Sequence, residues 1–262
     1  MSEAWGREQP LLSVDHLTIS YARRKPPAVR DVSFSIFAGE CVGLVGTSGC
    51  GKSTIARTLV GLEKPTAGEI RWRGKRLADF SREERRAYCR RVQLIFQDTL
   101  GVLNPRMRVG DCLDEVLRVH RAAELPDRAA RRACVAALLE RVELAPELAL
   151  RYPHEISGGQ RQRVGIARAL AVEPDLIVAD EPVSALDVAV QAQVLEMLKK
   201  LLRATGISMV FISHDLAVVR SLCPRILVMR RGEIVESGMT DEVYAHPRHP
   251  FTKALLDAVP KD

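Results

Sequence analysis

At 262 residues, with 47% apolar and 27% charged residues, the chain has the length and composition of a soluble globular protein with an ample core. No apolar run approaches the ~20 residues that cross a bilayer, and residues 1–10 are polar, so the sequence predicts no span or targeting segment and favours the cytosol. The formal charge of +6 is modest and its arginines are spread along the chain, which predicts a solvated basic surface and no nucleic-acid partner.

Periodicity in the first hundred residues alternates between strand and helix patterns. Apolar and polar residues alternate over 11–21 and 32–36, which predicts half-buried strands that we expect to be antiparallel. The apolar run 41–45 predicts a buried strand, followed by a helix over 55–62 and a short strand over 69–72. A charged helix is expected over 81–91 with Ser81 as its N-cap, and then a strand over 92–96.

The middle of the chain, about residues 98–164, has no strand pattern. Residues 109–120 and 127–142 read as amphipathic helices, so we expect a helical insertion into an α/β core. Beyond it the sequence predicts the following elements: a helix ending at Leu170, a strand over 175–181, a helix over 188–204, a strand over 207–212, a hairpin around Gly232, and short tail helices over 241–244 and 251–259.

The six cysteines show no Cys-x-x-Cys pair and no spacing typical of a metal site. In a reducing cytosol we expect them to be small buried apolar side chains or free thiols. Cys50 lies inside a functional motif described next, but we do not expect it to be a catalytic nucleophile.

The strongest functional signal is a nine-residue stretch between a predicted strand and a predicted helix. Its pattern, G-x-x-x-x-G-K-S, predicts a phosphate-binding loop because glycines leave backbone N–H groups accessible and the helix N-terminus adds positive dipole. Lys52 is expected to reach the outer phosphates and the Ser53 hydroxyl to ligate Mg²⁺; an ordinary Gly/Ser turn would not need this Lys-Ser pair. The stretch reads Gly46-Thr47-Ser48-Gly49-Cys50-Gly51-Lys52-Ser53-Thr54.

An acidic pair, Asp180-Glu181, ends the predicted strand over 175–181. Ligands of a parallel sheet gather beyond the carboxyl ends of its strands, where the phosphate loop also lies. We therefore expect Asp180 to hold Mg²⁺ through water and Glu181 to polarise the attacking water. On its own, a strand-end aspartate would more simply cap the next turn; the neighbouring phosphate loop favours the metal role.

A second anion-binding shape stands at the start of the helix that ends at Leu170. It reads Ser157-Gly158-Gly159-Gln160, with Ser157 as a natural N-cap and two glycines that let bare N–H groups approach an anion. A single nucleotide site within one chain does not need two anion-binding helix N-termini. The economical expectation is that this one faces the nucleotide bound to another subunit.

With these motifs in this order, the chain resembles the nucleotide-binding subunits of ATP-binding cassette (ABC) transporters over nearly its whole length. The resemblance implies an α/β fold: a P-loop NTPase core with an N-terminal antiparallel β subdomain and an α-helical subdomain insertion. It also implies a single domain over 1–262. Its expected parts are a core over 11–97 and 165–240, a helical subdomain over about 98–164 and a C-terminal tail over 241–262.

The resemblance assigns further residues. Gln97 matches a glutamine that senses Mg²⁺ and water, His214 a histidine that contacts the γ-phosphate, and Tyr21 an aromatic that stacks on adenine, although Tyr21 could equally pack in its sheet. Ser184-Ala185-Leu186-Asp187 matches the D-loop; Ile156 and Val183 stand where the family more often has Leu and Thr. The expected catalytic set is Glu181, His214, Gln97 and Lys52, and the expected metal set is Ser53, Gln97 and Asp180.

The implied mechanism is a head-to-tail dimer that sandwiches two ATP molecules with Mg²⁺ between phosphate loops and Ser157–Gln160 turns. The implied partners are a second ATPase subunit, identical or different, two transmembrane permease subunits and, indirectly, an extracytoplasmic binding protein. The expected location is the cytoplasmic face of the cell membrane. Two other interpretations are open: a soluble ATPase of this family acting on ribosomes or DNA, and a phosphate-loop kinase, which leaves the Ser157–Gln160 turn unexplained.

A narrower resemblance concerns the cargo. The segments 96–98, 103–106 and 249–256 are similar to the group of ABC ATPases that serve peptide and nickel uptake. Residues 59–63 and 72–74 lean toward the second ATPase of nickel importers. The resemblance therefore implies an importer of peptides or of nickel and other metal chelates.

Overall fold

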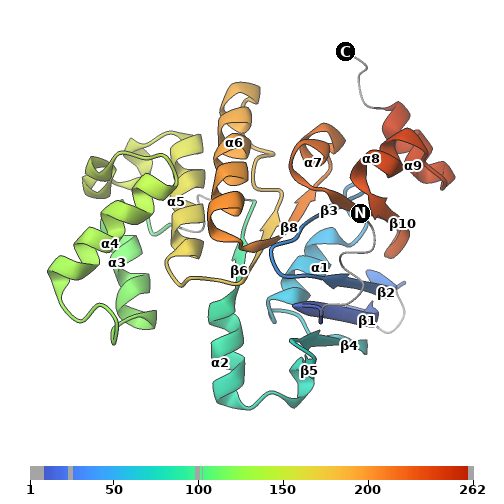
Figure 1. The fold of residues 1–262 in the computed structure, drawn as a ribbon, viewed down its shortest axis with the longest axis horizontal. Helices are drawn as coiled ribbons and strands as arrows, with labels where there is room; N and C mark the ends of the chain where they lie inside the picture. The colour runs from blue at the N-terminus through green and yellow to red at the C-terminus, as the bar shows by residue number, and fades with distance from the viewer. Residues whose placement is uncertain (1–8, 23–25, 98–100, 102, 259–262) are drawn as a thin grey trace.

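The computed structural model describes residues 9–22, 26–97, 101 and 103–258. Its described part contains a four-stranded antiparallel sheet with the order β2-β1-β4-β5, next to helix α1 (Lys52–Leu59), and a six-stranded sheet with the order β10-β9-β3-β8-β7-β6 (Figure 1). In the first sheet the strands are β1 (Leu12–Ile19), β2 (Val29–Ile36), β4 (Ala67–Trp72) and β5 (Lys75–Arg76).

The six-stranded sheet is parallel from β9 to β6 and carries antiparallel β10 at its edge. Every residue of β3 and β8, which lie in its interior, is buried, as expected for parallel strands covered on both faces. The strands are β3 (Cys41–Val45), β6 (Val92–Ile95), β7 (Leu176–Asp180), β8 (Ser208–Ser213), β9 (Arg225–Arg230) and β10 (Glu233–Met239).

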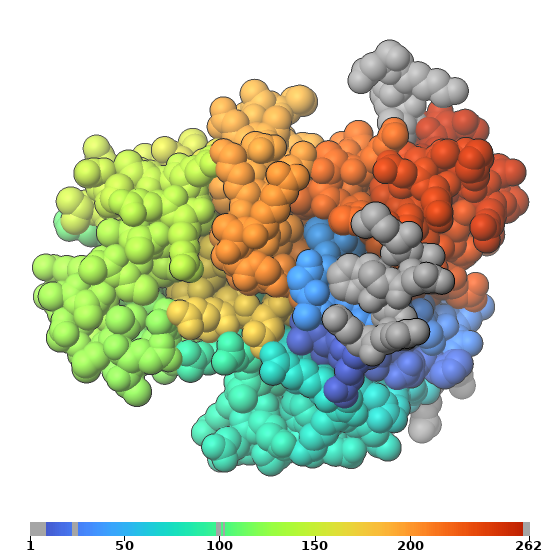
Figure 2. All heavy atoms as spheres, in the orientation of Figure 1, coloured from blue at the N-terminus to red at the C-terminus, as the bar shows by residue number. Residues whose placement is uncertain are grey.

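Helices cover the larger sheet and form a lobe at one end. Figure 2 shows α3 and α4 in this lobe, at the opposite end of the molecule from the C-terminal helices α8 and α9. The α-helices are α1 (Lys52–Leu59), α2 (Arg82–Arg91), α3 (Val109–His120), α4 (Arg128–Arg141), α5 (Gly158–Leu170), α6 (Val188–Thr205), α7 (Leu216–Leu222), α8 (Thr240–Ala245) and α9 (Pro250–Asp257). Three short 3-10 helices are η1 (Leu77–Asp79), η2 (Pro146–Leu150) and η3 (Pro153–Glu155), among the residues described.

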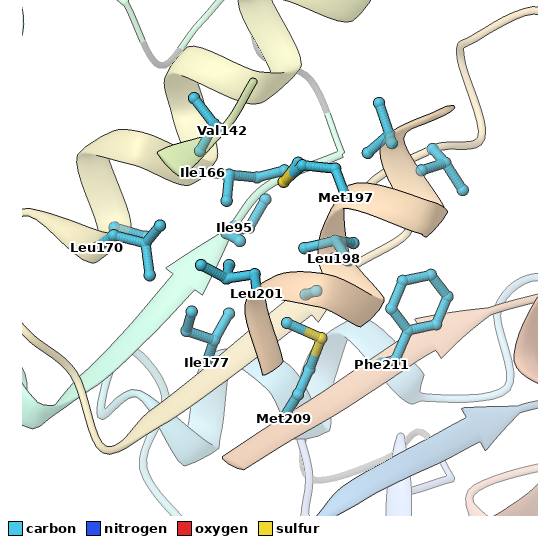
Figure 3. Close-up of a cluster of buried hydrophobic side chains, with 14 of the residues drawn as sticks. Ile95, Val142, Ile166, Leu170, Ile177, Met197, Leu198, Leu201, Met209 and Phe211 are labelled. Atoms are coloured by element: carbon cyan, nitrogen blue, oxygen red, sulfur yellow. The ribbon is translucent and has the colours of Figure 1, made fainter. Parts of the chain in front are cut away.

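Side chains of the large sheet alternate between two apolar clusters, because successive residues of a strand point to opposite faces. One face packs against α1 and the four-stranded sheet; its members include Val42, Leu44, Leu176, Val178, Val210 and Ile212. The other face packs against α5, α6 and α7, and that cluster continues into α3 and α4. Figure 3 shows this second cluster, with Ile177, Met209 and Phe211 of the sheet near Ile166, Leu170, Met197, Leu198 and Leu201 of the covering helices.

The strands and long helices predicted from periodicity are confirmed, with ends that differ by a few residues. Ser81 caps α2 as predicted: its hydroxyl accepts from the Glu84 N–H at 3.2 Å, and the Glu84 carboxylate accepts from the Ser81 N–H at 2.8 Å. Helix α7 was not predicted; it has two turns, and Asp215 caps it by accepting from the Ala217 N–H at 2.8 Å.

Every element described between β6 and β7 is helical, as expected for a helical insertion. The predicted division at residues 164 and 165 falls inside α5, which runs unbroken from the lobe onto the sheet. None of the helices in the described ranges has the length and apolarity needed to cross a membrane.

Candidate functional site

The loop from Gly46 to Gly51 joins β3 to α1 and has backbone that requires glycine. Gly49 and Gly51 have φ angles of +76° and +112°, in the region that L side chains rarely adopt. A Cβ at Gly51 would lie 2.4 Å from the carbonyl oxygen of Ala28. The chain can therefore curl at this point, and α1 begins at Lys52 with no acidic residue in its first turn to repel an anion.

Lys52 occupies the centre of the curl. It is only 5% exposed, and its ammonium donates to the carbonyl oxygens of Gly46 at 2.8 Å and Thr47 at 3.2 Å. Its Nζ also lies 4.0 Å from Oε1 of Glu181. A cation held in this way by loop carbonyls is placed to meet a polyphosphate.

The side chain of Cys50 points from the phosphate loop into the protein interior. The thiol is buried, and burial raises its pKa, although nearby Lys52 opposes the shift. A thiol kept protonated is a poor nucleophile, which agrees with the expectation that Cys50 is not catalytic. Only the backbone of Cys50 is left to take part in phosphate binding.

Ser53, in the first turn of α1, and Asp180, the last residue of β7, meet across the site. The Ser53 hydroxyl donates to Oδ1 of Asp180 at 3.1 Å. Burial raises the pKa of Asp180, and the neighbouring Glu181 charge adds to the shift, whereas the Ser53 hydrogen bond opposes it. A hydroxyl and a carboxylate are oxygen ligands of the kind Mg²⁺ prefers. Among the residues described, no group of three or more His, Cys, Asp or Glu could hold a metal ion.

The carboxylate of Glu181 is where the expected catalytic side chains converge. Its Oε2 lies 3.2 Å from Nδ1 of His214 and accepts a hydrogen bond of 3.3 Å from Nε2 of Gln97. The Glu181 side chain is 14% exposed, and its backbone has a φ of +50°, a costly conformation for a glutamate. Such strain persists only where the surroundings hold the residue, and it aims this carboxylate at the phosphate loop.

The order of the strands explains this convergence. Gln97 lies two residues beyond β6, Glu181 directly follows β7, and His214 directly follows β8. These three strands are parallel neighbours in the sheet, so their carboxyl ends lie side by side.

Ser184 has a role that the sequence analysis did not assign. Its hydroxyl accepts from Nε2 of Gln97 at 3.2 Å and donates to the carbonyl oxygen of Glu181 at 3.1 Å. It therefore fixes both the glutamine and the backbone of the glutamate. The sequence did hold one indication of this role, because Ser184 is the first residue of the segment that matches the D-loop.

Two arginines near Ser53 and Asp180 were not singled out from the sequence. Arg57 and Arg168 line a cavity together with Ser53, Gln97 and Asp180. Arg57 follows Ser53 by four residues on α1, and i, i+4 spacing places both on one face of the helix; that spacing was a usable signal. Arg168 comes from α5, which no local pattern connects to α1.

Tyr21 lies beside the start of α1, close to the phosphate loop. Its ring is 60% exposed, and its hydroxyl donates to Oγ1 of Thr54 at 3.2 Å. An exposed aromatic ring tethered at its hydroxyl presents a free face for stacking. Stacking of Tyr21 on adenine stays a prediction.

The Ser157–Gln160 turn lies elsewhere. The Ser157 hydroxyl accepts from the Gln160 N–H at 3.2 Å and the Gln160 side-chain oxygen accepts from the Ser157 N–H at 2.9 Å, so the two residues form a capping box. The helix that they start, α5, packs on the face of the large sheet opposite to α1. The structure thus gathers Lys52, Ser53, Gln97, Asp180, Glu181 and His214 at one site and leaves this turn at another.

Asp187 belongs to the neighbourhood of that turn. Its carboxylate caps α6 by accepting from the Val190 N–H at 3.0 Å, and a Cβ at Gly158 would lie 3.7 Å from Cδ2 of Leu186, which directly precedes Asp187. The sequence predicted that both glycines serve the approach of an anion. In the structure, however, Gly159 is buried and faces Val190.

Residues 29–184, more than half of the chain, match the family described as ABC transporter. The chain belongs to the ABC transporter family. Among relatives of this ABC protein, OppF of Haemophilus influenzae, named an oligopeptide transport ATP-binding protein, is 48% identical over 265 residues. That match covers 95% of the chain and 78% of OppF.

Solved structures of ABC ATPases share the fold. The cbiO1 protein of Clostridium perfringens, described as part of the ABC transporter complex cbiONQ, has a TM-score of 0.80 at 27% identity. The match covers 91% of this chain and 92% of cbiO1. The cassette MJ0796 was solved as a dimer in a post-hydrolysis state with ADP and Pi. It has a TM-score of 0.77 at 31% identity, and the match covers 87% of this chain and 98% of MJ0796. This ABC protein has a P-loop NTPase fold and is an ATPase.

Proposed function

We propose that this ABC ATPase energises the uptake of peptides, using ATP hydrolysed at the site around Glu181. The observation that carries the site is the convergence of Gln97, His214 and Lys52 on one carboxylate from separate elements. The peptide cargo is supported by the 48% identity to an oligopeptide transport ATP-binding protein over nearly the whole chain. Nickel is the competing cargo, favoured only by short stretches of sequence.

Each side chain has a definite task in this proposal. Glu181 accepts a hydrogen bond from the attacking water and so polarises it, while Gln97 and His214 hold its carboxylate in place. Lys52 and the first N–H groups of α1 neutralise the charge that develops on the transferring phosphoryl group. Hydrolysis is thus chiefly a matter of positioning and electrostatics, with no covalent step on the protein.

The proposed metal is Mg²⁺ bound together with ATP. Ser53 and Asp180 would hold it, and Gln97 lies beside them in the same cavity. Bound Mg²⁺ supplies charge neutralisation of the outer phosphates. Its presence would also offset the burial that raises the pKa of Asp180, because a neighbouring cation favours the charged carboxylate.

The proposed nucleotide site uses two chains. The phosphate loop faces one side of an ATP, and the Ser157–Gln160 turn of a second ATPase subunit closes over the other side. Two features support this: the turn and the loop lie on helices that cover opposite faces of the sheet, and the similar cassette MJ0796 was solved as a dimer. The turn is capped and exposed at Ser157, with no acidic residue in the first turn of α5.

A docking surface for a permease subunit is proposed next to the site. Leu62 and Val119 are 63% and 65% exposed, and Leu62 shares a groove with Phe96, which directly precedes Gln97. Exposed apolar side chains that line a groove are typical of a protein interface. A segment that presses on Phe96 would be one residue from the catalytic glutamine, which offers a short mechanical connection. This proposal places the protein at the cytoplasmic face of the membrane.

The cargo is tested by transport. The ATPase, purified with the permease subunits that accompany it in its own cells, is reconstituted in liposomes with its binding protein, and uptake of a radiolabelled pentapeptide is measured beside uptake of radioactive Ni²⁺. We expect ATP-dependent pentapeptide uptake, lost when the Glu181→Gln variant replaces the natural subunit. Uptake of Ni²⁺ without uptake of pentapeptide would contradict the proposal.

The two-chain site is tested by mixing two inactive variants, Lys52→Ala and Ser157→Phe. Random exchange makes half of the dimers mixed, and each mixed dimer has one fully intact site of two, so about one half of one half, or roughly a quarter, of wild-type hydrolysis should return. The control is each variant alone, in which both sites stay damaged. No recovery in a homodimer known to exchange subunits would contradict the two-chain site.

A further inference from the structure

The two adjacent glycines of the Ser157–Gln160 turn differ in the space around them. A Cβ on Gly158 would meet nothing closer than 3.7 Å, from a side-chain carbon of Leu186. A Cβ on Gly159 would lie 2.3 Å from Cγ1 of Val190, far inside van der Waals contact. Gly158 therefore has room for a side chain within its own subunit, and Gly159 has none.

The obstacle at Gly159 cannot easily move aside. Val190 is the third residue of α6, and a β-branched side chain in a helix has one strongly preferred χ1 rotamer. The backbone N–H of Val190 donates to the capping carboxylate of Asp187 at 3.0 Å. A shift of Val190 would therefore disturb Asp187 and the segment that leads back to Ser184 and Glu181.

We infer that Gly159 is a positioning residue: its bare Cα lets the first turn of α5 rest directly on the first turn of α6, so that Ser157 and Asp187 are presented to the neighbouring subunit as one rigid unit. Val190 faces Gly159, and Leu186 faces Gly158, so the same two segments oppose each other at both glycines. The inference rests on the two-chain site proposed above and adds a second requirement to it. The Ser157–Gln160 turn must approach a phosphate, and it must also be held at a fixed distance from α6.

The expected disturbance is large enough to measure. A new Cβ at position 159 would lie 2.3 Å from Cγ1 of Val190. Bringing it to an ordinary contact distance requires a separation of the two helices by roughly 1.2–1.7 Å, given optimal carbon–carbon distances of about 3.5–4.0 Å. A misplacement of about 1 Å in a group that orients a substrate can lower the rate on the order of 100-fold.

The test is a double-mutant cycle of Gly159→Ala and Val190→Ala. We expect Gly159→Ala to lower kcat for ATP by roughly 10- to 100-fold with a much smaller change in KM, because ATP binds first to the untouched phosphate loop. Adding Val190→Ala removes Cγ1 and leaves a Cβ at 3.7 Å from the new one, an ordinary contact. The double variant should therefore recover most of the lost rate.

Gly158→Ala is the matched control. Its new Cβ is remote from Val190, so any loss of hydrolysis that it causes should not be rescued by Val190→Ala. The midpoint of thermal unfolding, measured without nucleotide, gives a second readout: Gly159→Ala should lower it and the double variant should restore it. A double variant that regains its unfolding midpoint and stays as slow as Gly159→Ala would overturn the positioning role.

The two proposals fail in different ways. If residues 159 and 190 show no coupling in unfolding, the packing contact itself is refuted, whatever happens to hydrolysis. If Gly159→Ala hydrolyses ATP at the wild-type rate and the unfolding cycle is as expected, Gly159 has no positioning role in catalysis. The two-chain site is judged separately, by the mixing of Lys52→Ala with Ser157→Phe.

Discussion

The Lys52→Ala variant is expected to lose nearly all ATPase activity. Its ammonium is the cation held at the centre of the phosphate loop by the carbonyl oxygens of Gly46 and Thr47. Loss of a charge-assisted hydrogen bond costs about 1.5–3 kcal/mol in binding, and loss of one preorganised transition-state donor lowers kcat by roughly 100- to 1000-fold. Together these effects predict a fall in kcat/KM of at least about 1000-fold.

The measurement is phosphate release over a range of ATP concentrations, with binding followed separately by a fluorescent ATP analogue. Lys64→Ala is the control, because Lys64 is an exposed lysine beyond α1 and outside the site. Thermal unfolding of both variants separates a lost function from a lost fold. Turnover of Lys52→Ala at the wild-type rate would refute the assignment of the phosphate loop.

The Glu181→Gln variant is expected to bind ATP and fail to hydrolyse it. Glutamine has nearly the same shape as glutamate and preserves the packing at 14% exposure, but it lacks the negative charge that polarises water. Loss of a positioned general base lowers the rate by roughly 100- to 10,000-fold. Because ATP then persists between the phosphate loop and the facing Ser157 turn, the variant should accumulate as a dimer.

Two measurements check this variant: single-turnover release of phosphate, and light scattering of the protein with and without ATP and Mg²⁺. Glu196→Gln, on the exposed side of α6, makes the same chemical change away from the site and serves as the control. If Glu181→Gln turns over as fast as the control, another group activates the water. If it stops turnover and stays monomeric with ATP, the two-chain site is refuted.

Local features of the fold could be predicted because their causes are local. Alternating apolar residues predicted the strands, and a serine before each helix predicted the N-caps Ser81 and Ser157. The structure adds that each cap is a capping box, closed by Glu84 or by Gln160 three residues on. Helix α7 was not predicted because its seven residues make only two turns, which is too short for a clear apolar periodicity. Asp215 at its start was an indication of a helix N-cap.

The chemistry of the phosphate loop was also readable, because one continuous stretch supplies the glycines, Lys52 and Ser53. By itself, then, the sequence determined the types of element, their order, and the identity of the groups that handle phosphate. These depend on contacts within a few residues, and such contacts leave a pattern in the sequence.

Only the tertiary structure decided which distant residues meet. The bond from Gln97 to Glu181 spans 84 residues and exists because β6 and β7 are parallel neighbours, a choice that no local periodicity records. The same holds for Ser184 against Gln97, for the left-handed backbone of Glu181, and for Val190 lying where a Cβ of Gly159 would be. These contacts follow from how sheet and helices pack as a whole, because packing joins residues according to distance in space and not along the chain.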